Sequence, residues 1–272
     1  MRTWASLIRP VAGIAALLIV PFSVPASLAA ESCPGLTASG PLRMIPAALE
    51  PAALQADQAS LTFVGHATFL IESPGGVRIA TDYNDYVRPT VTPDIATMNR
   101  AHATHHSYAP DPGVRHVLRG WDAPGRPARH DLEVGDVRVR NVPTNTRDED
   151  GGTRLYGNSI FVFETAGLCI AHLGHLHHPL EPEHLRDLGR IDVVLAPVDG
   201  TWTLNRDDML SVLAALNAPL VVPMHYFGPE TLGRFLDKAR DRFEISFNET
   251  PTLVVSRATL PRRPRILVLP GR

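Results

Sequence analysis

Residues Ile160–His178 read IFVFETAGLCIAHLGHLHH, which is an apolar strand pair followed directly by a cluster of histidines. The apolar run is interrupted at Ala166 and Gly167, which predicts two strands joined by a tight turn. Four histidines then fall within seven residues. Because a strand end fixes a side chain rigidly and a neutral imidazole suits zinc, iron, copper or nickel, this pattern indicates a metal site at the end of a sheet.

Strands and helices alternate toward the C-terminus. Apolar strands are predicted over 191–197 and 220–225, and helices over 181–188, 207–216 and 229–242. The strand 220–225 ends in PMH, so His225 is a second imidazole at the end of a buried strand. Short strands at 244–247, 252–256 and 266–269 close the chain.

The part before Ile160 is rich in short strands. They are predicted at 61–64, 68–72, 77–81 and 116–119, with a hairpin over 131–142, whereas the proline-containing stretch 83–112 is expected to be irregular. Strands first and alternating strands and helices later predict an α+β protein with two sheets packed face to face and helices outside. A single domain over 59–272 accommodates all of these elements.

The N-terminus has the pattern of an export signal. Arg2 and Arg9 precede an uncharged apolar run that extends to residue 24, and small residues follow it, so residues 1–30 are predicted to be a cleavable signal peptide. Residues 31–58, rich in alanine and proline, form a linker or lead-in. The mature protein is therefore expected in the periplasm or outside the cell, with no integral membrane span after processing.

Charge and motifs narrow the class of partner. The net charge is -2 and no long run of like charge exists, which argues against nucleic acid and favours a small-molecule substrate. No G-x-S-x-G elbow, P-loop or G-x-G-x-x-G sequence is present. The oligomeric state is not indicated.

Several segments, taken in order, resemble the metallo-β-lactamase superfamily. Its opening is similar to Gly65–Glu72 (GHATFLIE) together with Ile79–Asp82 (IATD). The later segments His172–Leu180, Gly189–Val198 and Pro223–Tyr226 resemble the ascorbate-lactonase-like branch of zinc-dependent hydrolases. This resemblance implies an αββα sandwich with a metal site at one edge, between the sheets.

The metal ligands depart from the pattern of that superfamily. Its loop T-H-x-H-x-D-H is expected at Thr104–Pro110 (THHSYAP), which keeps the first histidine as His105, and His175 stands where the branch has an aspartate. A pair of metals needs about six ligands, with anionic groups among them. The resemblance therefore implies one metal, most simply zinc, with iron or manganese as alternatives. Its expected ligands are His105, His175 and His225, with a fourth position open for water.

Further residues are candidates for the same site. His106 or His178 could replace any of the three ligands. Asp82, directly after a strand, could be a general base or could hold an imidazole in place, and His66, at another strand end, could line the pocket. These two are the candidate catalytic residues. The histidines with no partner in view are read as ordinary structure or surface: His102, His116, His130 and His184.

The leading hypothesis is an exported metal-dependent hydrolase in which metal-activated water attacks an ester, lactone, amide or phosphoester. Two alternatives remain open. The altered ligand loop would suit a pseudoenzyme or binding protein that kept the fold, and the cluster His172–His178 would suit a periplasmic metal-binding protein.

Overall fold

The computed structural model describes residues 53–148 and 150–271. The predicted signal peptide 1–30, and the lead-in up to residue 52, lie outside the described residues. The first strand begins at Gln58, one residue before the predicted start of the domain at 59.

The first sheet has six strands in the order β13-β1-β2-β3-β4-β5. Its members are β1 (Gln58–Gly65), β2 (Thr68–Glu72), β3 (Arg78–Ala80), β4 (Ile95–Met98), β5 (His116–Arg119) and β13 (Thr252–Ser256). β1, β2 and β3 pair antiparallel, whereas β3, β4 and β5 pair parallel. As a result β1, β3 and β4 all end at the same edge of the sheet.

The second sheet has eight strands in the order β12-β14-β11-β10-β9-β8-β7-β6. Its members are β6 (Asp131–Val134), β7 (Val137–Arg147), β8 (Thr153–Thr165), β9 (Leu168–His172), β10 (Val193–Pro197), β11 (Leu220–Met224), β12 (Glu244–Phe247) and β14 (Arg265–Val268). β9, β10 and β11 pair parallel, so their carboxyl ends also meet at one edge.

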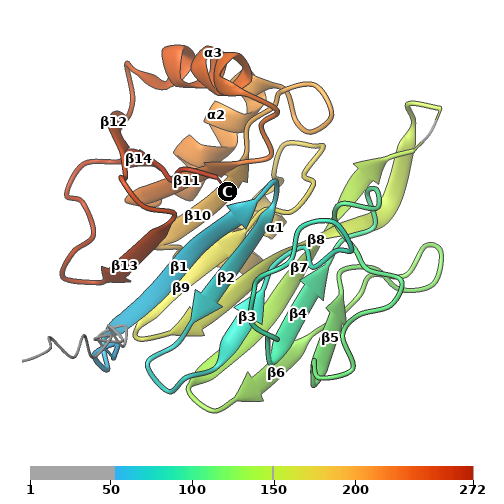
Figure 1. Cartoon of the computed structure of the whole chain (residues 1–272). Helices are drawn as coiled ribbons and strands as arrows, with labels where there is room; N and C mark the ends of the chain where they lie inside the picture. The colour runs from blue at the N-terminus through green and yellow to red at the C-terminus, as the bar shows by residue number, and fades with distance from the viewer. Residues whose placement is uncertain (1–52, 149, 272) are drawn as a thin grey trace, which may run out of the picture. The chain divides into compact units, whose positions relative to one another are not determined.

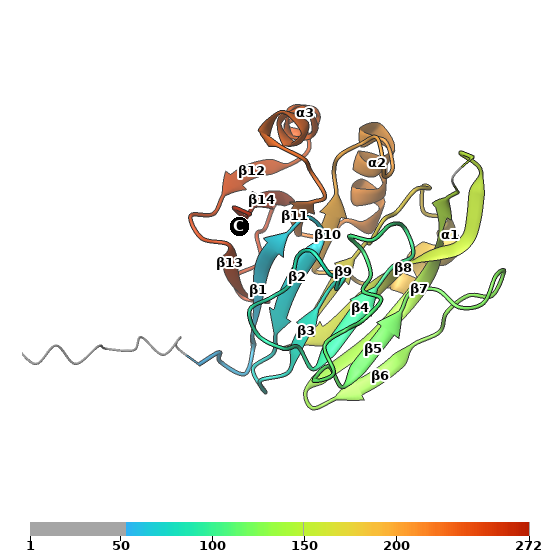
Figure 2. The same ribbon diagram turned by 45° about the vertical axis from the view of Figure 1, so that its right-hand side comes forward.

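The two sheets pack face to face (Figures 1 and 2), and a cluster of buried apolar side chains fills the space between them. β1 and β2 contribute Phe63 and Phe69 to this layer, and β8 contributes Phe161 and Phe163 from the facing sheet. All four rings are at least 97% buried. Burying aromatic side chains of this size supplies much of the hydrophobic free energy that holds sheet on sheet.

The helices of the described residues lie against the outer face of the second sheet (Figure 2). They are α1 (Pro182–Leu188), α2 (Arg206–Leu216) and α3 (Pro229–Ala239). Leu213 and Phe235 pack there against Val194 and Val221 of the sheet. The expected α+β sandwich of two sheets with outer helices is thus confirmed. None of these helices is long and apolar enough to cross a bilayer.

The outer face of the first sheet differs from the second. Its small apolar cluster, which includes Tyr83 and Met98, packs against the partly buried Trp121 in an irregular segment. β4 lies within the stretch 83–112 that was expected to be irregular, which corrects that prediction. Its four residues are all buried and it pairs parallel on both sides, so its sequence lacks the polar alternation that marks a half-exposed strand.

Candidate metal centre

Four histidines meet where strands of both sheets end. His66 follows β1 and His225 follows β11, while His102 and His105 lie in the loop after β4. One ring nitrogen from each lies within 4.8 Å of the corresponding nitrogen of the other three. His105 and His225 are fully buried, whereas His102 is exposed, so the group opens to solvent on the side of His102.

Three residues at these strand ends have left-handed backbone. The φ angles are +52° at His66, +40° at Asp82 and +54° at His225, although none of them is glycine. Such conformations cost roughly 1–2 kcal/mol each for an L-residue and cluster at functional sites. The turn at His225 also lets its N–H donate to the carbonyl of His66 at 2.7 Å, which joins the two sheets at the site.

A carboxylate holds each of the two buried histidines. Nδ1 of His105 lies 2.5 Å from Oδ2 of Asp82, and Nδ1 of His225 lies 3.1 Å from Oδ1 of Asp199. Asp82 itself accepts a hydrogen bond from Asn99 at 2.9 Å. Because a carboxylate is an acceptor, each Nδ1 carries the proton and donates it, which leaves each Nε2 as a bare acceptor.

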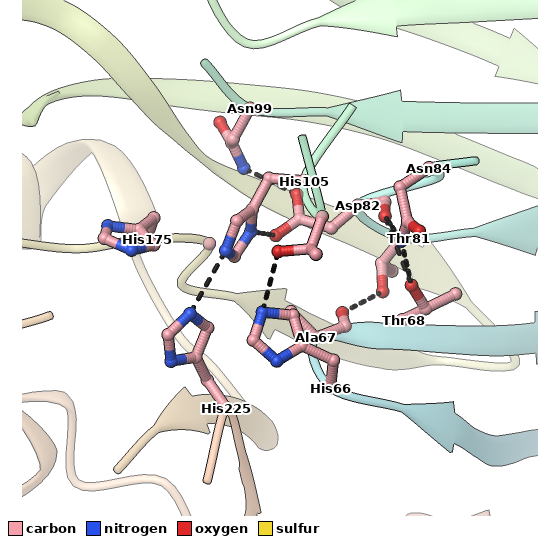
Figure 3. A network of polar contacts seen from close by, with 12 residues as sticks. His66, Ala67, Thr68, Thr81, Asp82, Asn84, Asn99, His105, His175 and His225 are labelled. Atoms are coloured by element: carbon pink, nitrogen blue, oxygen red, sulfur yellow. Dashed lines mark hydrogen bonds and ion pairs between the residues drawn. The ribbon is translucent and has the colours of Figure 1, made fainter. Parts of the chain in front are cut away.

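These two bare nitrogens face each other. Nε2 of His105 lies 3.2 Å from Nε2 of His225, and Figure 3 shows the two rings facing each other, with His175 on one side and His66 on the other. Two acceptor lone pairs at this distance have no proton to share, so a cation between them would relieve their repulsion. Two imidazoles bound to one tetrahedral zinc at about 2.0–2.1 Å place their nitrogens about 3.3 Å apart.

Burial favours the neutral form of three imidazoles at the site, those of His66, His105 and His175. Burial, and then the neighbouring His225 and His102, lower the pKa of His66 from 6.5 to about 3. Burial likewise lowers the pKa of His105 and of His175 well below the ordinary value. Neutral imidazole is the form that binds a metal, so the site is prepared for a cation at neutral pH.

The supporting carboxylates differ from each other. Burial raises the pKa of Asp82 to about 6, against the effect of nearby histidines and of Asn99. Burial also opposes the ionisation of Asp199, but hydrogen bonds from His225 and Thr203 outweigh it and hold the pKa of Asp199 well below its ordinary range. Both carboxyl groups are therefore ionised at pH 7.

His175 lies beside the four histidines. Its Nε2 is 3.2 Å from Nε2 of His102, while its Nδ1 is buried without a hydrogen-bond partner among the described residues.

The hydroxyl of Thr104 lies 2.8 Å from Nδ1 of His102 and 3.0 Å from Nε2 of His66. Thr104 thus orients two rings of the group at once.

Gly174 lets the loop after β9 approach the centre. It has a φ of +62°, and a Cβ on it would lie 2.4 Å from Oδ1 of Asn158 and 2.4 Å from Nδ2 of Asn99. Asn158 accepts the backbone N–H of His175 at 2.8 Å. Only glycine therefore fits between the two amides that position His175 and Asp82.

The donor set suits a first-row transition metal. Imidazole nitrogens suit zinc, iron, copper and nickel, and carboxylates bound to the far nitrogens are the usual second layer around metal-bound histidine. The facing Nε2 atoms of His105 and His225, and the Nδ1 of His175 that has no hydrogen-bond partner among the described residues, are better explained by a bound ion than by a metal-free site. His66, His102, His105 and His225 would hold it.

The structure brings most of the predicted residues together. His66, His105 and His225 lie in the group, His175 lies beside it, and Asp82 holds an imidazole, which is one of its two expected roles. Their functions stay predictions. His106 and His178 lie outside the group of four. His106 packs between Tyr108 and Trp121, and His178 lies beside His177.

Two important residues were missed from the sequence. His102 was read as ordinary structure, but it is one of the four grouped histidines. Asp199 was not singled out, although it holds His225 and, through the same carboxylate, the backbone N–H groups of Thr201 and Trp202. Its position two residues after the apolar strand β10 was the available signal, since His175 and His225 likewise follow the neighbouring strands β9 and β11.

Comparison with known proteins agrees with this geometry. The family model described as a β-lactamase superfamily domain matches residues 60–225, more than half of the chain. The chain belongs to this superfamily. The narrower resemblance to the ascorbate-lactonase-like branch stays a prediction.

Relatives carry names that mention a metal. A UPF0173 metal-dependent hydrolase of Methanoculleus marisnigri is 31% identical over 180 residues, which cover 61% of this chain and 80% of the relative. One from Methanospirillum hungatei is 25% identical over 211 residues, with 70% and 91% covered. Among solved structures, a metallo-β-lactamase superfamily protein of Thermotoga maritima, described as a proposed zinc-dependent hydrolase, is 31% identical. It matches with a TM-score of 0.57 over 79% of this chain and 100% of its own. A metallo hydrolase of Ignicoccus hospitalis, 19% identical, shares the fold with a TM-score of 0.52 over 79% of this chain and 97% of its own.

Proposed function

We propose that this protein is a metal-dependent hydrolase with a single, histidine-dominated metal centre. The observation that carries the proposal is the pair of bare Nε2 atoms of His105 and His225, 3.2 Å apart and each fixed by a carboxylate behind it. The names of the relatives support hydrolysis as the reaction class. Zinc is the simplest ion for such a set, and iron or manganese are alternatives.

The residues divide the work in the following way. A bound divalent ion would supply Lewis-acid activation of water for attack on an ester, lactone, amide or phosphoester bond. Asp82 and Asp199 are positioning residues, because each fixes the ring orientation and tautomer of one buried histidine. His102 is the exposed member of the group, so the substrate approaches on its side.

The structure also suggests a different alignment of the superfamily's ligand pattern with this sequence. The pattern T-H-x-H-x-D-H was expected on Thr104–Pro110, but it directly follows a strand in the superfamily, and β4 ends at Met98. We therefore place the pattern on Asn99–His105 (NRAHATH), where two of its three histidines are kept. Its three histidine and single aspartate positions are held in order by Arg100, His102, Thr104 and His105. The lost histidine and aspartate support one metal rather than two.

The test is metal content by mass spectrometry on protein purified without chelators, for the wild type, His225→Ala and His116→Ala. We expect about one zinc, iron or manganese ion per chain in the wild type and His116→Ala, and a large loss in His225→Ala. His116 lies in β5, outside the histidine group, so His116→Ala is the control for loss of any histidine. Circular dichroism verifies that the variants are folded.

Activity on a panel of esters, lactones and phosphodiesters completes the test. Turnover that follows metal content across the three proteins would support the hydrolase. If the wild type takes up no metal even after incubation with these ions, the proposal fails and the pseudoenzyme alternative gains support. Stoichiometric metal without any turnover would instead favour a metal-binding protein.

A further inference from the structure

A cavity of about 520 Å³ opens beside His102. This volume lies within the roughly 300–1,000 Å³ range of sites that bind small organic molecules. Three of its walls carry arginines, namely Arg100, Arg119 and Arg154. Because His102 also belongs to the histidine group, a molecule in this cavity would lie next to the proposed metal centre.

The guanidinium groups of the three arginines are not neutralised by a carboxylate in the described part of the chain. None of their guanidinium groups makes an ion pair or a hydrogen bond with another described residue. By contrast, many other arginines are paired with a carboxylate: Arg78, Arg88, Arg115, Arg126, Arg138, Arg140, Arg190, Arg240 and Arg265. Guanidinium groups grouped at a cavity without counter-charges favour an anion from outside.

The local charge is opposite to that of the whole protein. The chain has a net charge of -2, yet no carboxylate lies among the described residues that line this cavity. Arg154 is half-buried and also lines a neighbouring cavity of about 360 Å³ that includes His102 and His175. Asp148 lines that second cavity, but Oδ1 of its carboxylate accepts the backbone N–H groups of residues 150 and 152.

Aromatic rings form another wall of the larger cavity. The ring of His106 contacts Tyr108, with the two centroids 4.8 Å apart, and Trp121, with the centroids 5.8 Å apart. Tyr108 is 82% exposed, which is a large apolar area to leave in water. Planar rings beside guanidinium groups suit an organic anion that has an apolar body.

We propose that the substrate is an organic anion whose phosphate or carboxylate group is bound by Arg100, Arg119 and Arg154 in the cavity beside His102. Planar guanidinium groups bind either anion through pairs of parallel hydrogen bonds, so both share the same recognition chemistry. This inference rests on the proposed function only in calling the bound anion a substrate. The binding of the anion itself needs no metal.

The experiment measures binding by isothermal titration calorimetry on the full chain, as purified and after chelator treatment. The probes are phenyl phosphate, benzoate and the neutral benzyl alcohol. We expect one or both anions to bind the chelator-treated protein, benzyl alcohol to bind much more weakly, and high salt to weaken the anions. A preference for phenyl phosphate or for benzoate identifies which anionic group the cavity takes.

The double variant Arg100→Gln/Arg154→Gln tests the residues, and Arg242→Gln is the matched control. Arg242 is exposed after α3, and its substitution removes one positive charge, half the change of the double variant, from a site away from the cavity. Loss of charge-assisted hydrogen bonds should weaken anion binding by roughly tenfold or more in the double variant, while Arg242→Gln changes it little. Thermal unfolding verifies that the double variant is folded.

Three results would overturn the inference: no anion binding by the wild type, equal binding of benzyl alcohol, or equal effects of the double variant and Arg242→Gln. Failure of the hydrolase proposal looks different. In that case the metal or the turnover is missing, while arginine-dependent binding of the anion to chelator-treated protein persists.

Discussion

Asp82 shows at the scale of one residue that this site is built at a cost to stability. Its carboxylate is fully buried, its φ is +40°, and burial raises its pKa. Burying a charged group costs folding free energy unless the group is paired and hydrogen-bonded, so its presence calls for a functional reason. Its bond to His105 supplies that reason, because it fixes the nitrogen that faces the centre.

Asp82→Asn should therefore weaken metal binding more than it weakens the fold. We expect metal affinity to fall by about 10–100-fold, the usual effect of removing a group that orients a metal-bound histidine. The melting temperature of the metal-free protein should change little, since the variant also removes a buried charge. Competition with a chromogenic chelator measures the affinity.

Asp192→Asn is the matched control. Asp192 is also buried and accepts the backbone N–H of Cys169 at 2.8 Å, but it precedes β10, at the opposite end of the strand from the site. It should lower stability by about 1–3 kcal/mol, the cost of an unsatisfied buried group, and leave metal affinity unchanged. Equal metal affinities in the two variants would remove Asp82 from its positioning role.

At this scale the sequence reveals histidines that end long apolar runs. His225 directly follows a buried strand, so its place at a sheet edge could be predicted. His102 could not, because β4 is only four residues long and lies among prolines, and without that strand its loop has no fixed start. The pairing of Asp199 with His225 spans 26 residues and depends on the alignment of β10 and β11, which residue patterns do not specify.

The loop after β9 packs against the metal centre so closely that it leaves no room for a side chain at Gly174. Gly174 and Gly189 both have left-handed backbone, with φ of +62° and +65°. A Cβ at Gly189 meets nothing within 4 Å, whereas one at Gly174 would collide with Asn158 and Asn99. The pair therefore separates the cost of conformation from the cost of crowding.

Gly189→Ala should cost about 1 kcal/mol, or roughly 2–4 °C in melting temperature, and leave metal content unchanged. Gly174→Ala also forces a positive φ on an L-residue and must in addition displace the amides that hold His175 and Asp82. We expect at least twice the fall in melting temperature and a clear loss of metal. Similar melting temperatures and metal contents for the two variants would show that the loop tolerates the added methyl group.

Elements with strong periodicity were predicted with small errors. β2 and β5 were predicted with their observed bounds, and α3 ends at Ala239 rather than at 242. Turns such as Ala166-Gly167 can be predicted from the sequence because glycine accepts the positive φ that they need. The sequence of an element does not show which sheet it joins. For example, β13 pairs with β1, about 190 residues earlier in the chain.

Stability of the whole molecule should depend on pH in a definite direction. The pKa of His66 is lowered to about 3 and that of His177 to about 4, against 6.5 in the unfolded chain. Burial is the largest cause of both shifts. As pH falls below 6.5, the unfolded chain binds protons that the native state refuses, and the native state is destabilised. Asp82 acts in the opposite sense between about 6 and 3.8, but it offers one proton against those of several histidines, because burial also lowers the pKa of His105 and of His175.

Urea unfolding of metal-free protein at pH 7, 6 and 5 should therefore show a falling free energy of unfolding. The slope is about 1.4 kcal/mol per pH unit for each net proton. His177→Gln removes one of these histidines and should make the slope shallower. A slope that stays the same or steepens in this variant would contradict the assignment.

The division of the centre between the sheets has a consequence for how the protein matures. Residues 58–119 form strands of the first sheet and provide His66, Asp82, His102 and His105, while His175, Asp199 and His225 come from the second sheet. Each half holds only one carboxylate-supported imidazole of the group, His105 or His225, so the complete set of four histidines forms only when the sheets dock. We therefore expect binding of the proposed ion to report on assembly: a chain whose halves have not docked should bind it less well, and the loaded fraction of a preparation should indicate how many molecules have folded correctly.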